Sequence, residues 1–258
     1  MLRYLFILSA VAAAAEDTAY KDAIAKWRQQ KEEALKADGG WLTVTGLFWL
    51  KEGENRVANA PGVFDLHDGK TVFRDDRGGS TEMGPKASVN AGDRTFSVIE
   101  RGGRYGVRVK DKQSQLRKDF RGQHWFPVRE QYRIQAKFVS YPSRKSIAIL
   151  NIIGNHLQLP SPGYAVFKID GRELRLEPVL EEGEKELFFI LRDQTSGKET
   201  YPAGRYLYTD LPRDGKVEID FNKAENPPCA FTPYATCPLP PKQNILPARI
   251  EAGELTAH

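Results

Sequence analysis

The sequence predicts a mainly β protein: an antiparallel β-sandwich or barrel-like fold with one N-terminal helix and an ordered proline-rich C-terminal loop. After about residue 41, the spacing of apolar residues changes from a helical period to a period of two. Three Asp-Gly pairs stand between strand-like runs, and 22 glycines and 16 prolines divide the chain at short intervals. A chain of 258 residues buries roughly 70–75% of its unfolded surface, so it needs no disulfide framework to hold a core.

The N-terminus has the pattern of a signal peptide. Arg3 supplies a positive start, residues 4–11 are an apolar core, and residues 12–15 are all alanine. We therefore expect cleavage after Ala15 and export, most simply to a bacterial periplasm. The mature chain, residues 16–258, is expected to form a single all-β domain without a transmembrane segment, because the apolar core is shorter than the roughly 20 residues that cross a bilayer. An uncleaved anchor or a misassigned start is the alternative.

Residues 17–37 predict the one clear helix. Its apolar residues fall near one face, and charged or polar residues occupy the rest of the surface. So narrow an apolar stripe predicts a helix that lies on the surface of the protein and covers one edge or end of a sheet. The residues of the stripe are Ile24, Trp27, Ala34 and Leu35.

Residues 95–110 predict a β-hairpin. In its second strand the apolar side chains of Tyr105, Val107 and Val109 alternate with basic side chains. This alternation explains the basic cluster of residues 101–121 as a solvated face of the sheet more simply than an anion site does. The basic residues of the second strand are Arg104, Arg108 and Lys110.

The rest of the chain predicts further strands joined by tight turns. Asp-Gly tolerates the positive φ angles that two-residue hairpin turns require, and no helical pattern separates the strands, which favours an antiparallel arrangement. One domain of two packed sheets is the simplest interpretation, and a division near residue 130 is the alternative. The Asp-Gly pairs begin at Asp68, Asp170 and Asp214, and the strands are expected at residues 132–141, 146–153, 164–169, 173–180, 186–192, 205–209 and 217–221.

The C-terminal segment is dense in prolines between residues 227 and 241, which excludes a helix or a central strand. The same stretch holds Phe231, Tyr234 and both cysteines of the chain. Burial of each ring contributes about 1.5–3 kcal/mol. We therefore expect an ordered, extended loop pinned to the body of the fold.

Several segments together carry a family signature. They are residues 40–50 (GWLTVTGLFWL), 52–55 (EGEN), 101–106 (RGGRYG), 125–128 (WFPV), Asp193 with 195–197 (TSG), 199–201 (ETY), 204–205 (GR), 220–222 (DFN) and 226–241 (NPPCAFTPYATCPLPP). On these segments the chain resembles the bacterial and archaeal domain of unknown function 1684 family, over nearly the whole of the expected mature chain. The resemblance implies a single domain. It brings no established activity, and it offers no catalytic residues to carry over.

Cys229 and Cys237 are the only two cysteines of the chain. In an oxidising compartment a pair so close in sequence is expected to form a disulfide, which stabilises by about 2.5 kcal/mol in the chain-entropy model. Two free buried thiols, or a metal or redox role, are the alternatives. Zinc normally takes cysteines two to four residues apart with further ligands, and the four histidines are isolated in sequence, so we expect no metal site.

The sequence contains no nucleophile elbow, P-loop, dinucleotide fingerprint or His-Glu-x-x-His motif, so the catalytic residues are unknown and an enzyme is not the favoured interpretation. Polar residues near 193–205 either form a structural clamp or line a pocket with residues of the C-terminal segment. In such a pocket Arg205 provides a bidentate donor for a carboxylate or phosphate. The candidate ligand-binding residues are Glu199, Tyr201, Arg205, Asn222, Asn226 and Tyr234.

Three functions fit these features. The first is a small-ligand-binding or accessory β domain without chemistry of its own and without a cofactor. The second is a structural module that binds another protein through its proline-rich loop. The third is a periplasmic hydrolase that uses Glu199 with Asp193 or Asp220 as a carboxylate pair. The net charge of +4 is spread along the chain, so we expect no nucleic-acid partner.

Overall fold

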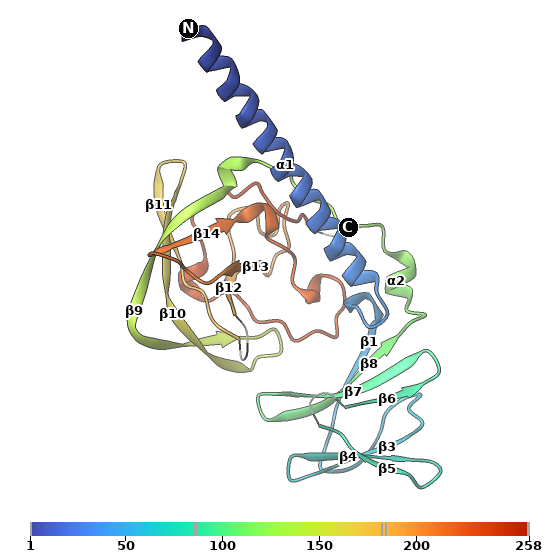
Figure 1. Ribbon diagram of the computed structural model, residues 1–258. Helices are drawn as coiled ribbons and strands as arrows, with labels where there is room; N and C mark the ends of the chain where they lie inside the picture. The colour runs from blue at the N-terminus through green and yellow to red at the C-terminus, as the bar shows by residue number, and fades with distance from the viewer. Residues whose placement is uncertain (1, 85–86, 182, 184, 257–258) are drawn as a thin grey trace.

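The protein is mainly β, as the sequence predicted. The computed structural model describes residues 2–84, 87–181, 183 and 185–256. In this part of the chain, strands form three four-stranded sheets and one two-stranded sheet, every pairing is antiparallel, and no sheet closes into a barrel. One long helix precedes them (Figure 1).

The long helix is α1 (Leu2–Lys36). Its second half packs on the β structure, where Ile24 is buried and the rings of Trp27 and Trp125 meet edge to face at 5.7 Å. Its first half extends past the body of the molecule (Figure 1). The helix predicted over residues 17–37 therefore begins earlier than predicted, since residues 2–16 belong to the same continuous helix. Within the described part of the chain, no helix combines the length and apolar character needed to cross a bilayer.

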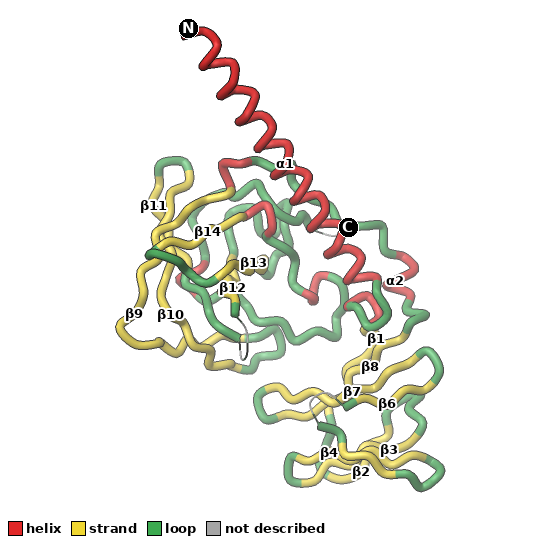
Figure 2. The backbone as a smooth tube through the Cα atoms, viewed as in Figure 1, coloured by secondary structure: helices red, strands yellow, loops and turns green. Residues whose placement is uncertain are grey.

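The strands between residues 44 and 111 form a small sandwich (Figure 2). They are β1 (Val44–Trp49), β2 (Gly53–Arg56), β3 (Gly62–His67), β4 (Lys70–Asp75), β5 (Ser80–Glu82), β6 (Ser88–Ala91), β7 (Arg94–Arg101) and β8 (Arg104–Asp111). One sheet has the order β1-β8-β7-β6 and the other β2-β3-β4-β5. Phe64 packs against Phe73 and Phe96 in the core between them, and Val107 and Val109 of β8 face the same core. The predicted hairpin over residues 95–110 is confirmed as β7 and β8.

The later strands surround a second core. They are β9 (Arg133–Leu150), β10 (His156–Ile169), β11 (Arg172–Leu176), β12 (Glu186–Leu191), β13 (Arg205–Asp210) and β14 (Lys216–Asp220). Four of them form the sheet β11-β10-β9-β14, and β12 pairs with β13. Phe167, Phe189 and Phe221 are buried together between these two sheets. Two predicted strands, residues 132–141 and 146–153, are one long strand, β9, which pairs with β10 from Lys137 to Leu150 across one irregularity.

The three Asp-Gly pairs make tight turns, as predicted. Asp68, Asp170 and Asp214 have φ angles of 49°, 49° and 50°, and the glycine after each also has positive φ. The first two turns join β3 to β4 and β10 to β11, and the third precedes β14. Because glycine follows in each pair, the second turn position is reached without strain.

The C-terminal segment, residues 221–256, is an ordered, extended stretch, which confirms the predicted proline-rich loop. It contains three single-turn helices and no strand of the named sheets. Phe231, Leu246 and Ile250 are buried, and the Thr232 hydroxyl donates to the Val44 carbonyl at 2.8 Å, which ties the segment to β1. The single turns are η3 (Phe221–Lys223), η4 (Pro228–Ala230) and η5 (Lys242–Asn244); the other short helices are η1 (Trp41–Thr43), α2 (Gln115–Asp119) and η2 (Glu130–Tyr132).

Arg205 anchors the C-terminal segment to β13. Its guanidinium pairs with Asp193 at 3.2 Å and donates to the carbonyls of Ile250 and Ala252. Asp193 in turn accepts from the Ile250 N–H at 2.8 Å. Both charged side chains are 0% exposed. This arrangement is the structural clamp that the sequence left open as the alternative to a pocket, and it leaves Arg205 no access to a ligand.

We predict that Asp193→Asn destabilises the protein by about 3–5 kcal/mol, because removal of one partner leaves the buried Arg205 charge uncompensated. Denaturant unfolding of the purified variant measures the change. Glu199→Gln is the control, because Glu199 and Arg249 form an ion pair on the surface and such pairs contribute little to stability. Equal stability of the two variants would contradict the anchoring role of the buried pair.

Candidate functional site

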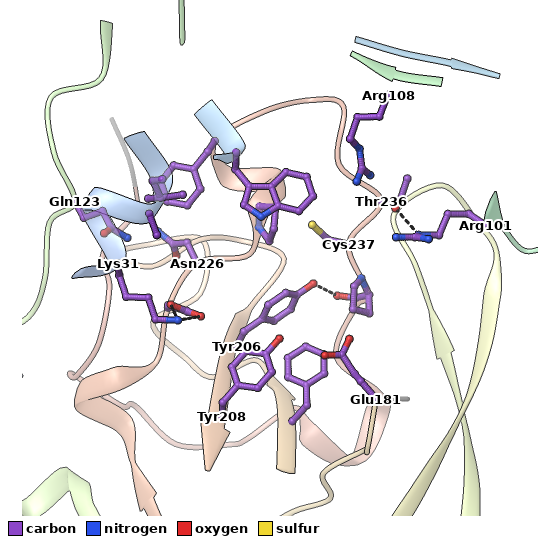
Figure 3. A pocket seen from close by; sticks show the side chains of 18 residues that line it. Lys31, Arg101, Arg108, Gln123, Glu181, Tyr206, Tyr208, Asn226, Thr236 and Cys237 are labelled. Atoms are coloured by element: carbon purple, nitrogen blue, oxygen red, sulfur yellow. Dashed lines mark hydrogen bonds and ion pairs between the residues drawn. The ribbon is translucent and has the colours of Figure 1, made fainter. Parts of the chain in front are cut away.

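A pocket of about 390 Å³ lies between the end of α1, η1, the β7–β8 hairpin, the β12–β13 pair and the C-terminal segment. Its volume is at the lower end of the range for small-molecule sites, roughly 300–1,000 Å³. Aromatic side chains make much of the wall, and three basic side chains reach it from different elements (Figure 3). The aromatic residues are Trp41, Phe188, Phe231, Tyr206 and Tyr208, and the basic residues are Lys31, Arg101 and Arg108.

Arg108 is the unusual member of this wall. It is 8% exposed, its guanidinium lies 5.0 Å from the ring centroid of Trp41, and its Nε and Nη2 atoms have no hydrogen-bond partner. Burial lowers the pKa of Arg108, and the like charge of Arg101 acts in the same direction. Among the described residues, no carboxylate forms an ion pair with it.

The solvated-face interpretation of the basic cluster is therefore wrong for Arg108. The alternation in β8 is confirmed, since Val107 and Val109 face the sandwich core and Arg108 faces the other way. That other face is covered, because the C-terminal segment places Thr236 and Cys237 beside it in the pocket wall. Arg104, on the same strand, does lie exposed, with its guanidinium over Trp49.

Glu225, Asn226 and Lys31 form the opposite side of the pocket (Figure 3). Lys31 pairs with Glu225 at 2.9 Å, and burial raises the pKa of Glu225 while the Lys31 charge partly offsets this. Asn226 is 5% exposed, and its Nδ2 donates to the Leu255 carbonyl at 2.7 Å. Its Oδ1 has no partner. The pocket therefore contains an unpaired donor group and an unpaired acceptor on different sides.

Glu254 lies behind this side of the pocket. It accepts from the backbone N–H of Asn226 at 2.7 Å. Burial raises the pKa of Glu254 to about 7, against the hydrogen bonds from Asn226 and Gln123, which lower it. The nearby Glu225 charge raises it further. A buried glutamate, Glu254, thus lies near the partly buried Glu225 at one end of the site.

The two cysteines are neighbours, and Cys237 lines the pocket. Both are free thiols in this structure, and the Cys229 N–H donates to the Cys237 sulfur at 3.1 Å. Hydrogen bonding with Cys237 lowers the pKa of the Cys229 thiol, and the Arg108 charge contributes to this. The two residues predicted to form a disulfide are therefore in contact. The disulfide itself stays a prediction.

Of the six candidate ligand-binding residues, Asn226 lines this pocket and the others do not. Arg205 is the buried anchor described above, and Glu199 pairs with Arg249 on the surface. The remaining three have structural or surface positions: the Tyr201 hydroxyl donates to the Cys229 carbonyl, Asn222 holds the backbone of Arg129, and Tyr234 is 37% exposed.

The carboxylates of the hydrolase hypothesis bind other side chains outside the pocket. Asp193 is closed off by Arg205 and by Thr195, and Asp220 accepts from the hydroxyl of Tyr20 at 2.8 Å. Neither they nor Glu199 line the pocket. Within the part of the chain that the structure describes, no group of three or more His, Cys, Asp or Glu side chains is placed to hold a metal ion.

Comparison with known proteins identifies the family of the chain. The model for a protein family of unknown function, DUF1684, matches residues 118–255, which is more than half of the chain. The chain belongs to this family. The match covers Tyr206, Asn226 and Cys237 of the pocket wall, whereas Trp41 and Arg108 precede it.

One solved relative of this DUF1684 chain is an uncharacterized protein of Haloarcula marismortui, determined by solution NMR. It is 30% identical, with a TM-score of 0.46, and the similarity covers 54% of this chain and 79% of the other. No curated protein matches the chain.

We predict that Glu254→Gln flattens the pH dependence of stability. Between about pH 4.5 and pH 7 the folded protein keeps a proton on Glu254 that the unfolded chain releases, so the free energy of unfolding falls as pH rises. The variant lacks this titration and should lose less stability between pH 5 and pH 8, by about 2–3 kcal/mol. Denaturant unfolding at the two pH values measures it.

The control for this prediction is Glu251→Gln. The neighbouring Arg249 lowers the pKa of Glu251, so this exposed carboxylate stays ionised over the whole range and its variant should keep the wild-type slope. A Glu254→Gln slope equal to that of the wild type would contradict a buried, protonated Glu254.

Proposed function

We propose that this DUF1684 protein is an exported β protein that binds a small molecule in the pocket between α1, β8 and the C-terminal segment, without chemistry of its own. One observation carries the proposal: Arg108 and Asn226 each present unpartnered polar atoms while more than nine-tenths buried in the pocket wall. An unsatisfied buried polar group costs about 1–3 kcal/mol. A ligand that pairs with these atoms removes that cost.

Export is the second part of the proposal. The sequence of residues 1–15 has the order of a signal peptide. The first half of α1 extends away from the body of the molecule (Figure 1). Cleavage after Ala15 would therefore leave the packed half of the helix, including Ile24 and Trp27, in place.

A protein-interaction role for the proline-rich loop has less support. The loop uses its side chains internally, since Phe231 and Cys237 are buried and Thr232 bonds to β1. A hydrolase role has less support as well, because Asp193, Glu199 and Asp220 are held by other partners. The pocket, by contrast, brings unpartnered polar atoms of Arg108, Gln123 and Asn226 into one wall.

A ligand screen tests the binding function. We expect at least one compound of a metabolite panel to raise the melting temperature of the wild-type protein in a concentration-dependent way. Ala34→Trp should abolish the shift, because Ala34 lies on α1 at the pocket wall and the indole fills the space. Gln29→Trp puts the same ring on an exposed position of α1 outside the pocket and should leave the shift unchanged. A shift that survives in Ala34→Trp contradicts binding at this pocket.

An intact mass of the exported, unreduced protein tests the export and the disulfide. We predict a chain that begins at Glu16, is two hydrogens lighter than the reduced chain, and resists thiol alkylation until it is reduced. The oxidised pair should stabilise the fold by about 2.5 kcal/mol over a Cys229→Ser, Cys237→Ser double variant. A chain that begins at Met1 contradicts export, and two alkylated thiols in the exported protein contradict the disulfide.

A further inference from the structure

We propose that the ligand of this pocket is an organic anion with a flat, apolar body, whose carboxylate or phosphate group pairs with the Nε and Nη2 edge of Arg108 beside Arg101. The inference rests on the proposed binding function and names the chemical class of the ligand. It concerns residues of the sandwich that precede the DUF1684 match.

The two unpartnered atoms of Arg108 define the anion. Nε and Nη2 lie on one edge of the planar guanidinium and present two parallel N–H donors, which is the geometry that a carboxylate or phosphate accepts in a bidentate pair. A neutral acceptor would satisfy the hydrogen bonds but would leave the buried charge without a counter-ion. An anion satisfies both.

Arg101 strengthens the preference for negative charge. Its Nε donates to the Thr236 hydroxyl at 3.2 Å and its Nη1 donates to the Glu100 carbonyl at 2.6 Å, so neutral oxygens hold it in the pocket wall. Arg101 and Arg108 are close enough for the charge of Arg101 to lower the pKa of Arg108. An anion placed between two guanidinium groups offsets this repulsion by its attraction to both.

The acidic residues of the lining lie apart from Arg108. Glu225 pairs with Lys31 on the opposite side of the pocket. Glu181 lies at the lower end of the view in Figure 3, beside the aromatic side chains, whereas Arg108 lies at the upper end. The pocket is therefore polarised, with its unpaired positive charge on one side.

The aromatic side chains define the body of the ligand. Phe188 and Tyr208 stack with ring centroids 4.6 Å apart and planes 5° from parallel, and Tyr206 meets Phe188 edge to face. Trp41 adds a further ring next to Arg108. Flat aromatic walls favour a flat apolar partner, because stacked or edge-on rings add to the free energy of burial.

The experiment titrates the wild-type protein with benzoate, phenyl phosphate and benzamide and follows binding by calorimetry or by NMR shifts of pocket residues. Benzamide keeps the ring and shape of benzoate without its charge. We expect saturable binding of at least one of the two anions, at least tenfold tighter than that of benzamide. Tighter binding of phenyl phosphate would assign a phosphate ligand, and tighter binding of benzoate would assign a carboxylate.

Arg108→Gln should weaken the binding of the preferred anion at least tenfold. Arg104→Gln is the matched control on the same strand, because Arg104 also lies over a tryptophan ring but is exposed and outside the pocket, and it should bind as the wild type does. Arg108→Lys, which keeps the charge and loses the two-pronged edge, serves as a second variant if Arg108→Gln does not fold. It should also bind more weakly.

Equal binding of benzamide and benzoate, or unchanged anion binding in both Arg108 variants, would overturn the inference. A neutral or cationic hit from the metabolite panel that Ala34→Trp blocks would overturn it as well, while the proposed binding function would stand. If no compound of any charge binds at the pocket, both fail.

Discussion

The buried ion pair of Arg205 and Asp193 is the interaction on which the position of the C-terminal segment depends. Residues 221–256 belong to none of the named strands, and isolated bridges rather than a continuous ladder of hydrogen bonds pair them with the rest of the fold. Arg205 and Asp193 add a buried side-chain anchor, because they bind Ile250 and Ala252 from a site without solvent. Once this end of the segment is fixed, Glu254 receives the backbone N–H of Asn226 and brings that residue to the pocket.

The pocket is a product of this anchoring. Its wall combines the end of α1, the sandwich strand β8, the β12–β13 pair and the C-terminal segment, which are far apart in the sequence. The DUF1684 match contains Tyr206, Asn226 and Cys237, whereas Lys31, Arg101 and Arg108 lie before it. The C-terminal segment therefore lies within the family match, and the basic residues that face it come from the part of the chain before that match.

Local patterns predicted much of this fold. The two-residue alternation gave the β7–β8 hairpin, and the three Asp-Gly pairs gave turns with positive φ angles. The prolines and aromatic residues between 227 and 241 predicted an ordered loop because they exclude regular structure yet carry apolar side chains. The sequence also indicated the polar cluster around Arg205. Its composition fits a clamp and a pocket equally well, and only the three-dimensional arrangement distinguishes the two.

The site itself was harder to predict for a physical reason. Alternation in β8 shows that Arg108 and Val107 face opposite ways, but it does not show what covers the basic face. The cover comes from residues more than a hundred positions later in the sequence. The alternation therefore predicted a solvated Arg108, whereas the side chain is buried. Glu225 and Glu254 gave no signal either, because they are brought together with residues far away in the sequence, Lys31 for Glu225 and Gln123 for Glu254.

The most direct test of the central claim is a crystal structure of the protein soaked with phenyl phosphate. An anion seated against Nε and Nη2 of Arg108, with its ring against the aromatic wall, is the predicted result. A pocket without ligand, in which both nitrogen atoms donate hydrogen bonds to acceptors of the protein itself, would contradict it.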